Sequence, residues 1–292
     1  MYPAEFGYVR PDTLDGVFTA LTEHGDDVKV LAGGQSLLPM MKLRLATPGV
    51  LVDLGAAAEL RGQWAIKDGV RIGAMTTYRE LRRSPRTLDL LPGLADTLAV
   101  IADPQVRARG TIGGAVAHGD PTADLPAMLL ALDAVVLLAS RRGVRRRPLE
   151  TFITGVYTTD IAPDEIVTAI EVPRPPAGTG AAYEKFEQPA SHLALCGVAA
   201  ALTVEGGRVR RARLAMTGVS STPRRLTVLE ETLIGLRVGE RALDEVARAA
   251  GQNVRPLDDM HAPGPYRLHL LRIATGRALK VAAARAGAGW AA

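Results

Sequence analysis

Two adjacent glycines near the N-terminus have the surroundings of a ligand-binding turn. They lie in residues 32–36 (AGGQS), directly after a short β-branched run over residues 28–32. Glycine adopts positive φ readily and has no Cβ, so such a pair lets backbone N–H groups approach a ligand, and Gln35 and Ser36 add side-chain donors. This combination suits a diphosphate, although a Gly-Gly pair by itself is more often an ordinary tight turn.

A second glycine pair occurs later, in residues 111–115 (TIGGA), with a hydroxyl donor at Thr111. Polar side chains follow it, among them Asp120 and Asp124, just before an apolar helix. We expect a second cradle here, for an anion or a sugar. Asp124 is either a ligand of that cradle or an ordinary helix N-cap, since Leu125-Pro126 would form the first turn. Two such loops in one domain favour a dinucleotide, because a long cofactor needs contacts at both ends.

Several common enzyme classes lose their main support. The motifs G-x-G-x-x-G, G-x-x-x-x-G-K-[ST], H-E-x-x-H and G-x-S-x-G do not occur, which argues against simple NAD dehydrogenases, P-loop enzymes, zinc proteases and serine hydrolases. Cys196 is the only cysteine, so the chain cannot form an internal disulfide, a four-cysteine zinc site or a cysteine-ligated iron–sulfur cluster. Any such centre must belong to another chain.

The composition is that of an ordinary globular protein. The 292 residues suggest about two domains. Aromatic residues make up only 4% and the net charge is +4, so neither base stacking nor charge predicts a nucleic-acid partner. The first residues show neither the basic nor the apolar region of a signal peptide, so none is expected, and the apolar stretch of residues 125–139 is too short to span a bilayer. We therefore expect a cytoplasmic protein without a membrane span.

Local patterns predict the elements that carry these loops. Leu14, Val17, Phe18 and Leu21 have helical spacing and predict an amphipathic helix over residues 13–24, which Gly25 ends. Strands are expected over residues 28–32 and 50–54, with hairpins turning at residues 67–69 and 142–143. The arginines of the second hairpin are expected to form a solvated face rather than a docking surface; they are Arg141, Arg142, Arg145, Arg146 and Arg147.

A Pro/Gly cluster over residues 173–180 predicts an extended link and a domain boundary. After it we expect strands and then helices, which is typical of an α+β domain. The strands are predicted over residues 183–188, 193–204 and 209–218, and the helices over residues 226–236, 241–252 and 266–284.

These motifs resemble the FAD-binding medium subunit of molybdenum hydroxylases, the carbon monoxide dehydrogenase and xanthine dehydrogenase family. The resemblance rests on residues 32–39 (AGGQSLLP) with 42–44 (KLR), on residues 109–114 (RGTIGG), and on the pattern D-P-x-x-D-x-P over residues 120–126. It covers the whole chain, because residues 183–186, 197–200 and 266–270 are similar to the C-terminal domain of that family. Two long motifs in the same order make it specific.

The resemblance implies an α+β fold. Residues 1–176 would form a p-cresol methylhydroxylase-type FAD-binding domain of two α+β subdomains, 1–57 and 58–176, with FAD between them. Residues 177–292 would form a CO dehydrogenase flavoprotein-like C-terminal domain, a three-stranded antiparallel sheet with helices.

The same resemblance implies roles for individual residues. The first loop would wrap the pyrophosphate, the second would line the pyrophosphate and flavin side, and Asp124 would accept a hydrogen bond from the cofactor. Lys185 would reach the isoalloxazine carbonyl region, where a cation stabilises reduced flavin. No catalytic residue and no metal ligand is expected. The implied cofactor-binding residues are Ala32, Gly33, Gly34, Gln35, Ser36, Thr111, Gly113, Gly114, Ala115, Asp124, Ile166 and Lys185.

Two segments depart from the family pattern. The family usually has Asn or Ser where this chain has Ala115, so one cofactor contact must come from the backbone or be absent, and a lower FAD affinity is expected. Residues 190–194 (ASHLA) differ from the commoner acidic and aromatic residues, which leaves open which group shields the flavin. We expect His192 to be a strand residue facing solvent rather than a group that titrates near the flavin.

The implied function is electron transfer. A large molybdopterin subunit would oxidise the substrate, a small subunit with two [2Fe-2S] clusters would relay electrons to FAD on this chain, and an external acceptor would receive them, in a heterohexamer that is a dimer of heterotrimers. The alternative is a stand-alone FAD-dependent oxidoreductase or tailoring enzyme without molybdenum partners. A scaffold that has lost FAD is a third alternative, disfavoured by the two intact glycine loops.

Overall fold

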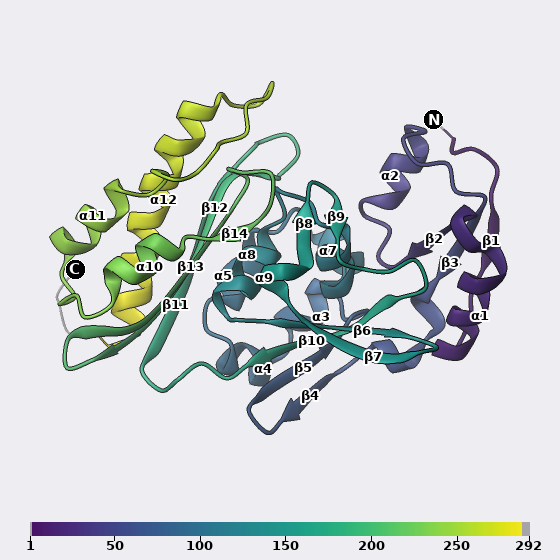
Figure 1. The fold of residues 1–292 in the computed structure, drawn as a ribbon, viewed down its shortest axis with the longest axis horizontal. Helices are drawn as coiled ribbons and strands as arrows, with labels where there is room; N and C mark the ends of the chain where they lie inside the picture. The colour runs from purple at the N-terminus through teal and green to yellow at the C-terminus, as the bar shows by residue number, and fades with distance from the viewer. Residues whose placement is uncertain (1, 288–292) are drawn as a thin grey trace.

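The computed structural model describes residues 2–287, in which three larger sheets follow one another along the chain, beside one sheet of only two strands (Figure 1). Helices and strands alternate in the first part and segregate in the last, so the α+β class is confirmed. The final residues expected in the C-terminal domain, 288–292, lie outside the described range. No helix within residues 2–287 has the length and apolar character needed to cross a membrane.

The first sheet is parallel, with the strand order β1-β3-β2. Its helix α1 forms as expected: Thr13 caps its start by accepting a hydrogen bond from the Gly16 N–H at 3.2 Å, and Gly25, at φ +53°, ends it. The carboxyl ends of parallel strands share one edge, where ligands commonly bind, and the first glycine loop leaves from this edge. The elements are β1 (Gly7–Val9), α1 (Leu14–His24), β2 (Val28–Leu31), α2 (Leu37–Lys42) and β3 (Val50–Asp53).

The second sheet is antiparallel, with the order β4-β5-β10-β6-β7. Both expected hairpins are present, because Ile66 pairs with Gly69 and Ser140 pairs with Gly143. The strands are β4 (Gln63–Ile66), β5 (Gly69–Gly73), β6 (Val135–Ser140), β7 (Gly143–Pro148) and β10 (Ile166–Pro173), and a small hairpin, β8 (Ile153–Gly155) with β9 (Thr158–Thr159), lies apart from this sheet.

Helices between β5 and β6 pack on this second sheet and place the second glycine loop. Leu94, Ile112 and Leu125 from three of these helices share one buried core with Ile72 and Val136 of the sheet. The helices are α3 (Tyr78–Arg82), α4 (Pro85–Leu90), α5 (Leu94–Val100), α6 (Pro104–Arg109), α7 (Ile112–His118) and α8 (Asp124–Ala131), and α9 (Leu149–Phe152) follows β7.

The third sheet contains the three long antiparallel strands that were expected, and a two-residue strand, β14, extends its edge. The helix expected to reach residue 236 ends earlier, because Gly235 has φ +79° and leaves the helical region. The elements are β11 (Thr179–Glu187), β12 (Ala194–Glu205), β13 (Arg208–Thr217), β14 (Arg224–Arg225), α10 (Thr227–Leu233), α11 (Glu240–Arg248) and α12 (Gly264–Arg285).

The third sheet is buried on both faces, and one face packs on the preceding part of the chain. Ala182 and Val198 face α12, whereas Tyr183 and Ala199 join the core that contains the helices of the second sheet. Polar contacts reinforce this seam: Asp133 pairs with Arg211 and with Arg213, the latter at 2.8 Å. The packing holds β11 against α5, and β12 and β13 against α8. Residues of β11 therefore help to build the site described next.

Candidate functional site

The two glycine loops are in direct contact. A Cβ at Gly33 would lie 2.3 Å from the carbonyl oxygen of Arg109, just before the second loop. A Cβ at Gly114 would lie 3.6 Å from the Cβ of Ala32. Because contacts below about 3 Å are not tolerated, only glycine at position 33 permits this approach. The fold therefore joins two segments that lie far apart in the sequence into one surface.

The first loop presents free hydrogen-bond donors. Within the described residues, the backbone N–H groups of residues 33–36 donate to no other group. Gly34 adopts φ +78°, and α2 begins with a hydrogen bond of 3.1 Å from the Leu38 N–H to the Gly34 carbonyl. Gln35 and Ser36 are exposed. Successive N–H groups in such a turn form a concave anion-binding surface, so this loop has the chemistry that a diphosphate requires.

The second loop uses its N–H groups differently, because the fold already satisfies several of them. The Gly113 N–H donates to the Ala74 carbonyl at 2.9 Å, and the Gly114 N–H donates to Thr111 Oγ1 at 3.1 Å. A Cβ at Gly113 would lie 2.4 Å from the Cβ of Ala74, so this glycine lets α7 pack closely on the chain that follows β5. Ala115 is half-buried and carries no donor. The second loop thus forms a closely packed wall beside the first.

A buried polar cluster lies at the start of α8. The Tyr183 hydroxyl donates to Asp124 Oδ1 at 2.7 Å, and the Lys185 ammonium donates to Asp124 Oδ2 at 2.8 Å. Tyr183 and Lys185 are two positions apart on β11 and therefore lie on the same face of the strand. The Asp124 carboxylate binds these side chains rather than backbone N–H groups, so the helix-cap interpretation of Asp124 is wrong.

Burial dominates the electrostatics of this cluster. Removal from water raises the pKa of Asp124 to about 6, even though the charge of Lys185 and the hydrogen bonds from Lys185 and Tyr183 act in the opposite direction. Burial and the neighbouring Asp124 carboxylate raise the pKa of the Tyr183 phenol well above its ordinary value. Tyr183 is therefore a neutral donor, and Asp124 is a carboxylate that is held ionised by its partners near neutral pH.

Lys185 has a complete set of acceptors. Besides Asp124, its ammonium donates to the carbonyl of Val100 at 2.9 Å and to the carbonyl of His192 at 2.7 Å, and only 3% of its side chain is exposed. An ammonium has three hydrogens, and all three are used here. Lys185 therefore connects the end of α5, the start of α8 and the turn before β12.

His192 lies in that turn, not in the expected strand. Its backbone has φ +57°, and β12 begins only at Ala194. Gln188 builds the turn: its side-chain oxygen accepts from the N–H groups of Ala190 and Ser191, both at 2.7 Å. The expectation that the His192 ring faces solvent is confirmed, because 45% of its side chain is exposed.

The structure brings the implied residues together in groups. The loops of residues 32–36 and 111–115 touch, and Asp124 meets Lys185. The Ile166 side chain is buried in a core against which Ala32 of the first loop packs. Sequence reasoning missed the partners of Lys185 and Asp124. Tyr183 could have been predicted as a neighbour of Lys185, because residues two positions apart lie on the same face of a strand. The Val100 and His192 carbonyls had no such local signal.

The arginines of the second hairpin are paired. Arg145 donates to Glu165 at 2.6 Å and to Asp160 at 2.9 Å, and Arg146 contacts Glu171 at 2.5 Å. The hydrogen bonds that Arg145 donates to Glu165 and Asp160 raise the pKa of Arg145 further above its ordinary value. This face is solvated as expected, but carboxylates neutralise much of it.

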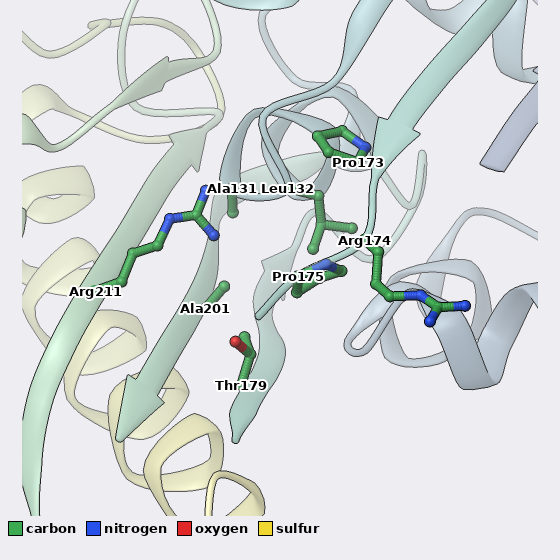
Figure 2. A pocket seen from close by; sticks show the side chains of 8 residues that line it. All are labelled: Ala131, Leu132, Pro173, Arg174, Pro175, Thr179, Ala201 and Arg211. Atoms are coloured by element: carbon green, nitrogen blue, oxygen red, sulfur yellow. The ribbon is translucent and has the colours of Figure 1, made fainter. Parts of the chain in front are cut away.

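A separate pocket lies at the seam between the second and third sheets (Figure 2). Its volume is about 20 Å³, which is room for about one water molecule and far too little for a dinucleotide. Among the described residues, no group of three or more His, Cys, Asp or Glu side chains could hold a metal ion. The pocket is lined by Ala131, Leu132, Pro173, Arg174, Pro175, Thr179, Ala201 and Arg211.

Comparison with known families identifies the architecture. Residues 4–175 match the FAD binding domain in molybdopterin dehydrogenase, and residues 181–282 match the CO dehydrogenase flavoprotein C-terminal domain. The chain belongs to this family of FAD-binding medium subunits. The resemblance inferred from the two glycine motifs is therefore confirmed.

Individual relatives match the sequence of this medium subunit over almost their full length. The chain is 39% identical over 286 residues to the carbon monoxide dehydrogenase medium chain of Afipia carboxidovorans, covering 98% of this chain and 99% of that protein. It is 35% identical to the glyceraldehyde dehydrogenase medium chain of Sulfolobus acidocaldarius, covering 96% and 99%.

Solved structures show the same fold. Carbon monoxide dehydrogenase from Hydrogenophaga pseudoflava matches with a TM-score of 0.94 at 40% identity, covering 98% of this chain and 99% of that chain. Quinoline 2-oxidoreductase from Pseudomonas putida matches with a TM-score of 0.92 at 32% identity, covering 99% and 100%.

The residues of this medium subunit fit FAD, the cofactor of the matched domain. The free N–H groups of residues 33–36 match an anionic diphosphate. Asp124 retains acceptor capacity, because each carboxylate oxygen has a second lone pair beside the one that Tyr183 or Lys185 uses. The fold thus supplies anion donors at the first loop and a buried carboxylate with spare acceptor capacity at the start of α8.

Proposed function

We propose that this chain is the electron-transfer subunit of a molybdenum hydroxylase. Electrons from [2Fe-2S] clusters on a small partner chain arrive at its FAD site and leave to an external acceptor, while a large molybdopterin chain oxidises the substrate. Support comes from the relatives, which are named as medium chains or subunits of dehydrogenases. The single cysteine agrees with metal centres placed on other chains.

The contact between Gly33 and Arg109 is the main structural support for this proposal, because it joins the two loops into one site. We propose that residues 32–36 bind the diphosphate through their free N–H groups and that residues 111–115 form the adjacent wall. FAD, when bound, accepts single electrons and releases a pair. The site residues named from the sequence, with Ile166 lying close to the cofactor, remain our proposal for the contacts to FAD.

Lys185 and Asp124 control the environment at the other part of the site. Since all three Lys185 hydrogens are used, direct contact with a cofactor oxygen requires exchange of one carbonyl. We propose that the His192 carbonyl is the one exchanged, because it lies in an exposed turn, whereas the Val100 carbonyl belongs to the end of helix α5 and Asp124 is buried. In either arrangement the buried ammonium places a positive charge beside the site.

We propose that the chain divides at the link after β10, into residues 1–176 and 177–292. The first part divides again near residue 57, since the parallel sheet ends at Asp53. The two parts share a core and ion pairs at the seam, so they would act as one body in an assembly. For that assembly we propose a dimer of heterotrimers.

Purification of the native assembly tests this function. We expect this chain to copurify with a large and a small chain, with FAD, molybdenum and iron in the complex and FAD on this chain. The mass should correspond to two copies of each chain. An isolated yellow protein that reduces a small substrate without iron or molybdenum would contradict the proposal and favour a stand-alone flavin enzyme.

A further inference from the structure

Tyr78, at the start of α3, is a buried side chain whose hydroxyl lacks a partner in the described part of the chain. Only 8% of the residue is exposed, and its ring belongs to the core beneath the second sheet. The buried polar atoms without partners among residues 2–287 are Arg107 Nε and Thr275 Oγ1. The Tyr78 hydroxyl also makes no hydrogen bond, but it is not among these inaccessible atoms. Its oxygen therefore retains access to solvent. The small exposed part of Tyr78 therefore includes its only polar side-chain atom.

The surroundings of Tyr78 belong to the second glycine loop. Its backbone N–H donates to the Gly110 carbonyl at 3.0 Å. A Cβ at Gly110 would lie 2.6 Å from Cε2 of the tyrosine ring, so the ring packs directly on the residue before Thr111. The loop and the ring are thereby fixed against each other.

The carboxylates of Asp124 and Asp120 lie close enough to Tyr78 for their charges to act on its hydroxyl. Burial, followed by the carboxylates of Asp124 and Asp120, raises the pKa of the phenol above its ordinary value. The hydroxyl is consequently a neutral donor at all physiological pH values. Asp124 is paired with Lys185, but no described residue forms a salt bridge with Asp120. A phosphate here would be repelled by Asp120, whereas a neutral polar group would not.

We propose that the Tyr78 hydroxyl is a cofactor-binding group that donates a hydrogen bond to an oxygen of the neutral, flavin-bearing half of FAD. This inference rests on the proposed function, because it requires that FAD occupy the surface between the two loops and Asp124. The diphosphate belongs, in our proposal, at the free N–H groups of residues 33–36. A buried tyrosine with an open hydroxyl also loses little conformational freedom when it binds, because packing already holds its ring.

Titration of FAD into the purified full chain tests the assignment, with Tyr78→Phe as the variant and Tyr266→Phe as the control. Tyr266 is half exposed and lies on α12. Loss of one hydrogen bond should weaken FAD binding by about three- to tenfold in Tyr78→Phe and leave Tyr266→Phe unchanged. The melting temperature of the FAD-free chain should not change, since the hydroxyl has no partner in the fold. ADP used to displace FAD should bind both variants like wild type.

Unchanged FAD affinity in Tyr78→Phe would overturn this inference and leave the proposed function standing. An equal loss of ADP affinity, or a lower melting temperature of the FAD-free variant, would also overturn it, because the hydroxyl would then serve the diphosphate side or the fold. A wild-type chain that takes up no FAD would overturn the proposed function and this inference together.

Discussion

Gly33 faces the carbonyl oxygen of Arg109 so closely that a Cβ on Gly33 would lie 2.3 Å from it. This contact joins the loop after β2 to the segment that leads into α7. The first loop offers free N–H groups and the second offers a packed wall, so neither is complete as a site without the other. On our proposal that FAD binds at these loops, its affinity depends on how closely their backbones pack.

Gly33→Ala should therefore separate the loops. We expect FAD affinity to fall at least about tenfold, and the free energy of unfolding of the FAD-free chain to fall by about 1–3 kcal/mol, as is usual for overpacking. Fluorescence titration with FAD and urea unfolding measure the two effects. Gly239→Ala is the control, because Gly239 has extended backbone and open space around its Cβ position. Equal behaviour of the two variants would contradict the role of the contact.

The Asp124–Lys185 pair should show strong energetic coupling. Lys185→Met leaves the buried carboxylate without its cation and should lower the free energy of unfolding by about 3–5 kcal/mol. Asp124→Asn should cost clearly less, because burial already opposes the Asp124 charge. The double variant should lose clearly less than the sum of the two single losses, because it strands no buried charge. A double-mutant cycle by urea unfolding measures this coupling, and additive losses would show that the pair does not act as a unit.

Stability should depend on pH through Asp124. The pKa of Asp124 in the folded chain, about 6, lies above its ordinary value of 3.8, because burial opposes the charge. The folded chain thus binds this proton more tightly than the unfolded chain. The resulting stability is fully present below about pH 4 and is lost as the pH rises through 6. As the pH rises over this window, the free energy of unfolding of wild type should fall relative to that of Asp124→Asn. A rise relative to Asp124→Asn would mean that the charge of Lys185 outweighs burial.

Cys196 should be unreactive in the folded chain. Burial raises the pKa of its thiol to about 12, and the side chain is inaccessible within β12. Since the thiolate is the reactive form, labelling by iodoacetamide at about pH 8 should be at least tenfold slower in the native chain than in denaturant. Mass spectrometry of the labelled peptide measures this, and rapid native labelling would show that the strand opens.

Local patterns were sufficient to predict the elements and the two loops. The spacing of Leu14, Val17 and Leu21 predicted α1, and the turns at Asp68-Gly69 and Arg142-Gly143 predicted two hairpins, because each signal lies within a few residues. The extra strand β14 was not predicted, since two residues carry no periodic signal.

The details of the site depended on tertiary packing and could not be predicted. Lys185 and Val100 are 85 positions apart, and no spacing rule connects an ammonium on a strand to the carbonyl at the end of a distant helix. His192 was expected in a strand, but Gln188 stabilises a turn there through two backbone N–H groups. The helix-cap interpretation of Asp124 was equally reasonable locally, until β11 placed Tyr183 and Lys185 against it.

A crystal structure of the full chain loaded with FAD tests the central claim most directly. The account predicts one FAD per chain, with its diphosphate against the N–H groups of residues 33–36 and residues 111–115 alongside. A diphosphate bound elsewhere, or either loop turned away from the cofactor, would contradict it.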